Sequence, residues 1–429
     1  MVIENIKNRK FFYGWWISFT ALIVNAILSA PSFGAAGLWI DALETEYGWT
    51  RTQLAIAFSL GQLEGTITSP LVGYLIDKIG AKKTALTGTF IAIFGFLILT
   101  QTVPITNSRD NIFDPLIFYI AYLIIMLGGS MSGWVPMTSI VNNWFTYKRT
   151  LAMSIASSGF SIGTFLLVPI LALLINPNLL GWNKTAFIIA IFIPIISVLI
   201  WKFIYDKPSD ISLLPYGENN YQNDGKSLNI ENSKDFTIIE AIKEKVFWIM
   251  AFAHGGSAML TSTMMVHLIL AFKNQGLSLE IASLMWGITM GIGGLSQLFG
   301  GIIGDKFTKR YSLAIFGCIQ SIGVVFAYMV DNIILAIVFA LIYGIGFGAR
   351  APITTAMRGE YFGRKSFGKI MGISLIPMMF MTMIAPVLAG YIYGLDENYK
   401  SAFIYIGTLG FIGNFMFVFA KPPIHPANR

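Results

Sequence analysis

Apolar segments of about twenty residues recur along the whole chain, separated by short polar stretches. About twelve can be drawn, at 15–39, 54–76, 84–102, 115–140, 150–175, 185–205, 246–272, 281–303, 311–329, 333–356, 367–394 and 401–420. A helix needs roughly 18 or more apolar residues to cross a bilayer, whereas a barrel strand needs only about ten. The pattern therefore predicts an all-α polytopic membrane protein with about 12 transmembrane helices. The lipid bilayer is then one expected partner of the protein.

The composition agrees with this prediction. Hydrophobic residues make up 55% of the 429 residues, charged residues 12%, and the mean hydropathy is +0.67. Soluble domains carry about 25% charged residues, so this chain cannot form the surface of a soluble protein. The first apolar segment is too long and begins too late for a cleaved signal peptide, and we expect it to remain in the mature protein.

One long polar stretch divides the apolar segments into six and six. We expect an N-terminal bundle at 1–205, a cytoplasmic linker at 206–243 and a C-terminal bundle at 244–429. Within the linker, Thr237 is followed three residues later by Glu240, which is the spacing of a helix capping box. A short surface helix and an unstructured loop are both compatible with this stretch.

Basic residues are unevenly distributed over the polar stretches. If the N-terminus is cytoplasmic, most of the 29 Lys and Arg residues fall on the same side of the membrane. The stretches on the other side hold only Arg51, Arg109, Lys184, Lys273 and Lys400. By the positive-inside rule we expect both termini in the cytoplasm and the protein in the plasma (inner) membrane. The net charge of +7 then reflects topology, and nucleic acid is not an expected partner.

A charged turn occurs once in each half of the chain. Residues 73–83 read GYLIDKIGAKK and residues 300–310 read GGIIGDKFTKR. A solvated loop would explain one copy, but the same spacing at matching places favours a duplicated transporter. Asp77 can cap the following helix or pair with a basic neighbour. Small residues also follow one face of the segment before the first turn and predict close helix contact there: Gly61, Gly65, Ser69 and Gly73.

The first turn matches completely the G-x-x-x-D-[RK]-x-G-x-[RK]-[RK] signature of the major facilitator superfamily, and the second resembles it. The resemblance covers the whole chain. It implies two pseudo-repeated six-helix bundles that work by alternating access around a central cavity. It also implies a gating role for Gly73, Asp77, Lys82, Lys83, Asp305 and Arg310.

Three further motifs resemble the branch of this superfamily that holds bacterial monocarboxylate transporters and the oxalate:formate antiporter. They are Tyr13-Gly14-Trp15-Trp16, Asn143-Trp144-Phe145 before Lys148-Arg149, and Lys207-Pro208-Ser209-Asp210 leading to Pro215-Tyr216-Gly217. The chain departs from animal monocarboxylate transporters, because 15–39 lacks their lysine and 281–303 lacks their Asp/Arg pair. It also lacks the oxalate transporter's basic residues in the eighth and eleventh segments, which argues against a substrate as compact as oxalate.

Two charged residues, Glu64 and Arg350, lie well inside apolar segments. Each such charge costs roughly 2.5–3.5 kcal/mol or more at the bilayer centre, so it calls for an explanation. Glu64 precedes Asp77 by thirteen residues, which places it about 20 Å from the turn, near mid-membrane. A structural ion pair between the two is one explanation. The repeat favours function, because the matching positions are Ile292 and Trp134, and a scaffold requirement should recur in both halves.

Other polar residues accompany these charges. Tyr343, Phe347, Arg350 and Thr354 share one face of the tenth segment, which lines the central cavity in this superfamily. We assign substrate binding to Arg350, Tyr343, Thr354, Asn25, Trp134 and His254. His254 can also carry a proton, as can Glu64, although a histidine that only hydrogen-bonds within its bundle is the commoner case.

The sequence contains no nucleotide-binding loop, no metal-ligand cluster and no nucleophile triad, so neither an enzyme nor a resident cofactor or metal is expected. The prediction is a secondary active transporter, functional as a monomer, that takes up a small monocarboxylate-like anion with protons. Arginine fits a carboxylate because its fork donates in pairs and keeps its charge. The alternatives are a drug/proton antiporter of the same fold, disfavoured because Thr164 follows Gly163 where such exporters carry Gly-Pro, and a transporter-like sensor, which normally has a large soluble domain.

Overall fold

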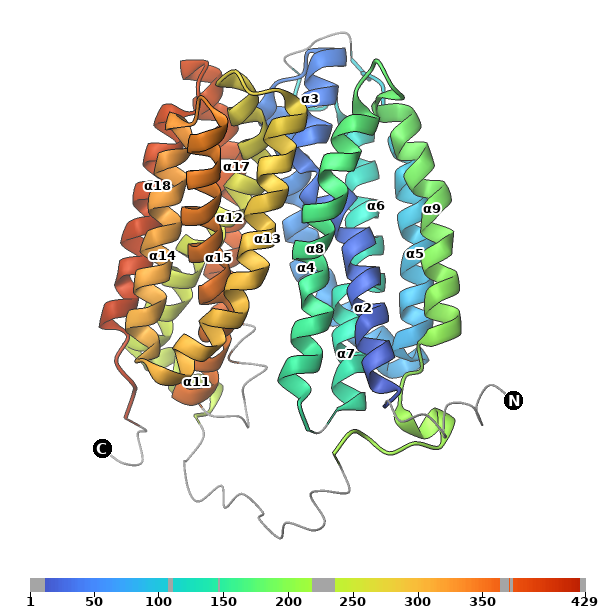
Figure 1. Ribbon diagram of the computed structural model, residues 1–429, viewed down its shortest axis with the longest axis vertical. Helices are drawn as coiled ribbons and strands as arrows, with labels where there is room; N and C mark the ends of the chain where they lie inside the picture. Colours follow the sequence, from blue (N-terminus) through green and yellow to red (C-terminus); the bar gives the residue numbers. More distant parts are fainter. Residues whose placement is uncertain are drawn as a thin grey trace. The chain divides into compact units, whose positions relative to one another are not determined.

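The computed structural model describes residues 12–106, 111–145, 147–217, 236–362, 370 and 373–424. It is 84% helical, and no strand occurs in the described residues, which confirms the predicted all-α membrane fold (Figure 1). Eleven helices within the described residues are long and apolar enough to cross a membrane. The helix over the predicted segment 54–76 is not among the eleven, although it is 29 residues long. It carries Gln53, Gln62 and Glu64, which make it less apolar than the others.

Internal contacts divide the chain into two compact units. The first comprises Met1–Ala42 and Leu63–Asn229, and the second comprises Leu43–Gln62 and Ile230–Arg429. The long helices of the first unit are α2 (Gly14–Ser29), α5 (Ala81–Leu99), α6 (Leu116–Ser132), α7 (Trp134–Trp144), α8 (Arg149–Ile175) and α9 (Gly181–Phe203). Those of the second are α12 (Lys245–Asn274), α13 (Leu279–Lys306), α14 (Lys309–Phe326), α15 (Ile333–Phe362), α17 (Ile376–Asp396) and α18 (Lys400–Phe415). Helices α3 (Ala36–Tyr47) and α4 (Arg51–Ile79) contribute residues to both units.

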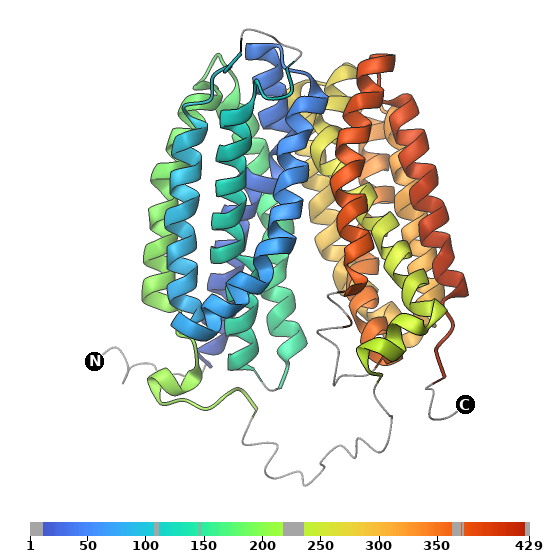
Figure 2. The ribbon, with the colours of Figure 1, turned by 180° about the vertical axis from the view of Figure 1, so that it is seen from behind.

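Three helix pairings of the first unit recur in the second, as Figures 1 and 2 show from two sides. In the first unit α5 packs against α6 and α9, and α2 packs against α8. In the second unit α14 packs against α15 and α18, and α12 packs against α17. These pairs correspond in chain order, so the repeat seen in the charged turns extends to the packing.

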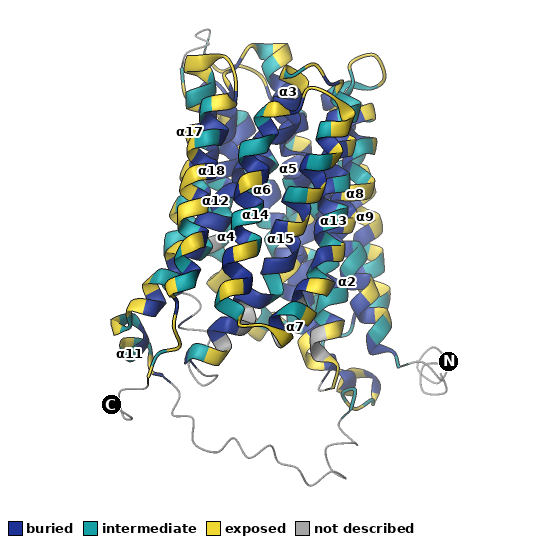
Figure 3. Cartoon of the chain, turned by 60° about the vertical axis from the view of Figure 1, so that its left-hand side comes forward, coloured by how far each residue is buried: buried dark blue, intermediate teal, exposed yellow. Residues whose placement is uncertain are grey.

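Most long helices bury one face and expose another (Figure 3), whereas α12 is buried along most of its length. The exposed faces carry large apolar side chains, among them Phe90, Phe94, Ile195, Trp201 and Phe299. Such faces would be unstable in water, whereas hydrocarbon solvates them well. The exposed surface therefore fits a lipid environment.

Two predicted segments are interrupted in the structure. The first predicted segment, 15–39, contains a π-helical turn, η1 (Ala30–Gly34), between α2 and α3. Pro31 lies at its start and cannot donate to a helical hydrogen bond, so the regular ladder breaks there. Trp39 Nε1 donates to the Pro31 carbonyl oxygen at 2.7 Å, which ties α3 back to this turn. The fourth segment, 115–140, is likewise divided at Gly133, between α6 and α7.

The linker begins and ends in short helices. A 3-10 helix, η2, covers Pro208–Ile211, and α11 covers Ile238–Lys243. Glu240 Oε2 accepts hydrogen bonds from the backbone N–H and the hydroxyl of Thr237, both at 2.8 Å. The Glu240 N–H donates back to Thr237 Oγ1 at 3.4 Å, so the predicted capping box and its short helix are confirmed. Residues 218–235 lie outside the described residues.

Candidate functional site

Arg350 lies on α15, 6% exposed, and its guanidinium group joins three helices of the second unit. Its Nε donates to Gln320 Oε1 on α14 at 2.7 Å. Its Nη2 donates to Thr261 Oγ1 at 3.3 Å and to the Ser257 carbonyl oxygen at 3.4 Å, both on α12. Gln320 Nε2 in turn donates to Thr261 Oγ1 at 3.1 Å and to the Tyr343 hydroxyl at 3.3 Å. All these acceptors are neutral, so they orient the guanidinium group without neutralising its charge.

The predicted polar face of α15 surrounds this arginine. Tyr343 is fully buried, and its ring stacks between Phe339 and Phe347 at centroid distances of 5.5 and 6.2 Å. The Arg350 Cζ atom lies 5.9 Å from the centroid of the Phe347 ring. Thr354 Oγ1 donates to the Arg350 carbonyl oxygen at 2.9 Å, so its hydroxyl proton is used by its own helix. Tyr343 thus belongs to the Arg350 network, whereas Thr354 retains only an acceptor for a ligand.

A second arginine on the same helix is buried as well. Arg358 lies beyond the predicted segment 333–356 and was not predicted as a site residue, yet it is only 2% exposed. Its Nη2 donates to His254 Nδ1 on α12 at 2.8 Å. An arginine can only donate, so His254 Nδ1 accepts and the ring is neutral, with its proton on Nε2. His254, predicted to bind substrate or to carry a proton, therefore serves here as the acceptor that orients Arg358.

The two arginines retain donors that no described residue satisfies. Arg358 Nε and Nη1 are buried and have no hydrogen-bond partner in the described part of the chain. Within the same residues, Arg350 Nη1 and His254 Nε2 donate to no acceptor. Neither arginine forms an ion pair with a described carboxylate. Buried cations without a countercharge are costly, and a bound anion would satisfy both the charge and the donors.

Glu64, the other predicted charge, lies on α4 in the first unit and is half-buried. Its Oε1 accepts from the Thr68 hydroxyl at 2.6 Å. Its Oε2 is buried and has no hydrogen-bond partner among the described residues. A carboxyl group in this setting can take up and release a proton without breaking an ion pair.

Asn25 and Trp134, predicted as substrate-binding residues, belong to the first unit, whereas Arg350 belongs to the second. Asn25 is buried, and its Nδ2 donates to the Ala156 carbonyl oxygen at 3.0 Å, which ties α2 to α8. Trp134 begins α7 and is 56% exposed. Asn25 is thus engaged in helix packing, whereas the Trp134 ring is open to its surroundings.

The first charged turn is capped by a residue that sequence reasoning missed. Asp77 is exposed at the end of α4 and does not cap α5. Gly80, in the left-handed region at φ +91°, turns the chain so that the Lys82 N–H donates to Asp206 Oδ1 at 2.7 Å. Lys82 Nζ also lies 5.0 Å from the Tyr205 ring centroid, while Lys83 is exposed.

In the second turn, Arg310 Nη2 donates to the Tyr311 hydroxyl at 2.9 Å. The side chain of Asp305 lies outside the described residues. The prediction of close helix contact along Gly61, Gly65, Ser69 and Gly73 is wrong for two of these positions. A Cβ at Gly65 or Gly73 would have no atom within 4 Å in the described part of the chain. Close approaches occur instead where α5 meets α6 and where α13 meets α15, at glycines such as Gly128 and Gly348.

The three motifs that resemble the monocarboxylate branch meet in one aromatic cluster of the first unit, made by Phe12, Tyr13, Trp15, Trp144, Phe145, Tyr205 and Tyr216. Tyr216 follows the sixth long helix, yet its ring lies 5.7 Å from Phe145 and 5.8 Å from Trp15. Its backbone N–H donates to the Trp144 carbonyl oxygen at 2.9 Å. The motifs therefore have a structural explanation: they anchor the start of the linker to the ends of α2 and α7.

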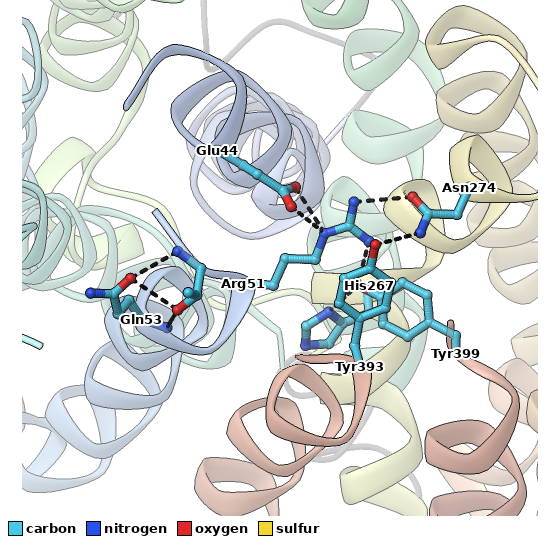
Figure 4. Close-up of polar contacts among 8 residues, drawn as sticks. Glu44, Arg51, Gln53, His267, Asn274, Tyr393 and Tyr399 are labelled. Carbon is cyan, nitrogen blue, oxygen red and sulfur yellow. Dashed lines mark hydrogen bonds and ion pairs between the residues drawn. The ribbon is translucent and has the colours of Figure 1, made fainter. Parts of the chain in front are cut away.

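Figure 4 shows a polar cluster in the second unit that the sequence did not predict. Arg51, assigned from sequence to a polar stretch, is the first residue of α4 and is only 7% exposed. Its Nε donates to both carboxylate oxygens of Glu44, at 3.0 and 2.8 Å. Its Nη1 donates to the Tyr399 hydroxyl at 3.1 Å, and its Nη2 to Asn274 Oδ1 at 3.0 Å. The Cζ atom lies 4.1 Å from the Tyr393 ring centroid, in cation–π geometry.

His267 extends this cluster into the unit. Its Nε2 lies 2.8 Å from the Pro386 carbonyl oxygen, which can only accept. The neutral ring therefore carries its proton on Nε2, and Nδ1 accepts from the Tyr399 hydroxyl at 2.9 Å. Burial raises the pKa of the Tyr399 hydroxyl above its usual value. A directed chain of hydrogen-bond donors thus runs from Arg51 through Tyr399 and His267 to the Pro386 carbonyl oxygen. The sequence held one signal, which concerns only the place of Arg51: Thr50 and Gln53 form a capping pair that starts α4 there.

The sequence matches the model of the Major Facilitator Superfamily over residues 21–349 and 247–429. The chain belongs to the Major Facilitator Superfamily. Members of this superfamily are transporters rather than enzymes, so the predicted fold and general activity are confirmed. A structure of a bacterial homologue of the human lysosomal transporter Spinster, in an inward-facing and occupied conformation, is similar to this one with a TM-score of 0.68. It is 11% identical and covers 94% of this chain and 96% of its own, which supports the fold alone.

Relatives of this superfamily member include transporters of the predicted branch. YybO of Bacillus subtilis (strain 168), described as an uncharacterized transporter, is 21% identical over 422 residues, which is 94% of this chain and 93% of YybO. Human monocarboxylate transporter 10 is 21% identical over 436 residues, which is 96% of this chain and 79% of that transporter. The oxalate:formate antiporter of Oxalobacter formigenes is 19% identical over 303 residues, which is 70% of this chain and 66% of the antiporter. The resemblance to this branch is therefore confirmed.

Proposed function

We propose that this protein is a secondary active transporter that takes up a small, monocarboxylate-like organic anion together with protons, by alternating access. One observation carries the proposal. Arg350 is 6% exposed, is oriented by neutral groups and has no carboxylate partner among the described residues. A guanidinium group held in that state, with Nη1 left to donate, is preorganised for a carboxylate, because it loses little conformational freedom on binding.

Monocarboxylate transporter 10 and the oxalate:formate antiporter support an organic anion as substrate, since their names state such substrates. The proposal does not depend on those relatives for its residues. Arg350 would hold the carboxylate, and Tyr343, through its bond to Gln320, would keep the guanidinium group in position.

Glu64 is the proposed proton carrier. Its carboxyl group has one buried oxygen without a partner among the described residues, so its protonation breaks no ion pair there. His254 is less suited, because a proton on Nδ1 would remove the acceptor of Arg358 and add a positive charge beside it. We place both termini in the cytoplasm and the protein in the plasma (inner) membrane on the distribution of Lys and Arg, and expect a functional monomer.

The test is uptake of labelled mono- and dicarboxylates into proteoliposomes, with and without an inward proton gradient. We expect at least one acid to accumulate only with the gradient. Arg350→Ala should nearly abolish its binding, and Arg350→Lys, which keeps the charge but loses the fork, should weaken it. Lys243→Gln, which removes one positive charge from an exposed position of the same unit, is the matched control and should behave as wild type.

Other outcomes would favour the alternatives. Efflux of cationic dyes in exchange for protons, with no uptake of any acid, would indicate a drug/proton antiporter. Binding of an acid without movement across the bilayer would indicate a sensor. Binding of the acid by Arg350→Ala as tightly as by wild type would show that the carboxylate is held elsewhere.

A further inference from the structure

We propose that Arg358, oriented by His254, is a second anion-binding residue of the Arg350 site, and that the substrate carries two acidic groups joined by a short aliphatic spacer. This inference rests on the proposed function, because it concerns the same site and specifies its substrate. It keeps the transport of a small organic anion and the role of Arg350, and it replaces the monocarboxylate-like anion of the proposed function by a dianion. Arg358 has buried donors without a partner among the described residues. A single carboxylate bound by Arg350 would not satisfy them.

The two guanidinium groups converge on neighbouring turns of α12. Arg350 and Arg358 are eight residues apart, so their Cα atoms are separated by about 12 Å along α15. Arg358 contacts His254, whereas Arg350 contacts Ser257 and Thr261, three and seven residues further along α12. At 1.5 Å per residue these contacts lie about 4.5 to 10.5 Å apart along α12. The guanidinium groups are thus about one to two helical turns apart on the same side of α15.

The balance of charge favours a dianion. Arg350 and Arg358 are 6% and 2% exposed, and neither has a carboxylate partner among the described residues. One carboxylate would neutralise one guanidinium group and leave the other buried and unpaired, which is the costly arrangement. Two carboxylates would neutralise both. They would also accept from Arg350 Nη1 and from Arg358 Nε and Nη1, which donate to no described residue.

The separation of the two groups selects among dianions. Oxalate joins its carboxylates directly, so it reaches both guanidinium groups only at the shorter end of this range and not at a separation of two helical turns. A spacer of a few methylene groups, as in succinate or glutarate, brings each carboxylate to its own arginine. His254 is a positioning residue here, because its Nδ1 accepts from Arg358 Nη2 and so fixes the orientation of the guanidinium group.

The first experiment uses the purified full-length protein without any substitution. Binding of succinate, monomethyl succinate, oxalate and butyrate is measured at pH 7 by calorimetry and by thermal stabilisation. Monomethyl succinate has the length of succinate but one charge less. We expect succinate to bind at least about tenfold more tightly than monomethyl succinate or butyrate, since a hydrogen-bonded charge is added, and oxalate to gain no such advantage. Equal binding of succinate and its monomethyl ester would overturn the inference.

The second experiment compares variants by the ratio of succinate to butyrate affinity. Arg358→Gln should reduce that ratio from about tenfold to near one, whereas Arg350→Ala should weaken both ligands. His254→Gln keeps an acceptor for Arg358 and should retain the preference, whereas His254→Leu should lose it. Lys243→Gln, with the same loss of charge at an exposed position, should keep the wild-type ratio.

The outcomes separate this inference from the proposed function. Binding of butyrate that depends on Arg350, with a ratio unchanged in Arg358→Gln, would leave the proposed function standing and refute the role of Arg358. Failure of every acid to bind would refute both. If Arg358→Gln does not fold, the comparison of succinate with its monomethyl ester on the wild-type protein decides the matter.

Discussion

The Nε atom of Arg51 donates to both carboxylate oxygens of Glu44, at 3.0 and 2.8 Å, and the two residues lie on successive helices, α3 and α4. The same guanidinium group reaches Asn274 on α12 and Tyr399 before α18. One side chain therefore fastens the start of α4 to elements more than 200 residues away in the chain. Arg51, the residue at the centre of these contacts, is only 7% exposed.

Arg51→Gln is expected to destabilise the protein by about 2 kcal/mol or more, because Glu44 and Tyr399 lose a charged donor in a buried position. A double-mutant cycle with Glu44→Gln should give a coupling free energy of about 1–2 kcal/mol, measured by denaturant or thermal unfolding in detergent. The pair Lys309–Glu360 is the control, because Glu360 is 56% exposed and its cycle should give less than about 1 kcal/mol. Equal coupling in both pairs would contradict the buried role of Arg51.

Comparison of wild type with Tyr399→Phe should show how the stability contributed by this cluster depends on pH. Burial raises the pKa of the Tyr399 hydroxyl, so the folded state favours the protonated form. This stabilisation is fully present below the unfolded pKa of about 10 and is lost as the pH rises above it. The difference in unfolding midpoint between wild type and Tyr399→Phe should therefore shrink above about pH 10. A difference that stays constant from pH 8 to 11 would show that the hydroxyl does not titrate with folding.

Much of the fold follows from the sequence, because a bilayer demands about twenty apolar residues for each helix and leaves a pattern that a single chain displays. The charged turns at Asp77 and Asp305 also allowed the internal duplication and the superfamily to be predicted. The breaks at Pro31 and Gly133 were not predicted, because neither one places a charged residue inside the predicted segment. Hydropathy reports the length of a segment and not its hydrogen bonding.

The candidate site was predicted only in part, and for a definite reason. Glu64 and Arg350 stood out because each is a charge flanked by apolar residues on both sides. Arg51 and Arg358 lie at the edges of apolar segments, where a charge normally faces water, so the sequence assigned them to polar stretches. Their burial depends on partners such as Tyr399 and His254, which are distant in sequence and come close only through the packing of α12, α15 and α18.

The charged turns provide a test of gating. Asp77→Asn should reduce the initial rate of uptake of the best substrate while leaving membrane insertion intact, because the substitution removes a charge of the signature without changing its size. Asp305→Asn should act more mildly, since the second turn matches the signature less completely. Full activity in both variants would remove the gating role. Asp206→Ala is a useful comparison, because Asp206 caps α5 and the loss of its Oδ1 acceptor should lower stability instead.

The orientation in the membrane can be tested with single cysteines in a Cys318→Ala background. Cysteines at Asn107 and Asn398 should react with an impermeant thiol reagent added to intact cells, whereas a cysteine at Asn223 should react only after permeabilisation. The expectation follows from the positive-inside rule applied to the Lys and Arg residues. The reverse pattern of labelling would invert the proposed topology and place both termini outside.

The last prediction separates proton coupling from substrate binding. Glu64→Gln keeps an oxygen that can accept from the Thr68 hydroxyl, so the local hydrogen bond is preserved while the titrating group is lost. The variant should therefore lose accumulation driven by a pH gradient yet retain substrate binding and exchange at equilibrium. Asp331→Asn, which neutralises an exposed carboxylate, is the matched control and should accumulate substrate as wild type does.

A purely structural role for Glu64 predicts something different. If its charge served only an ion pair, Glu64→Gln would misfold, and removal of the partner's charge as well would rescue folding in part. If a well-folded Glu64→Gln protein accumulated substrate at the wild-type rate and with the wild-type pH dependence, Glu64 would not be the coupling residue. His254 would then be the next residue to test, and its hydrogen bond to Arg358 would have to break whenever it takes up a proton at Nδ1. Coupling through His254 would thus release Arg358 in the same step, so protonation of His254 and the affinity for the anion would be linked.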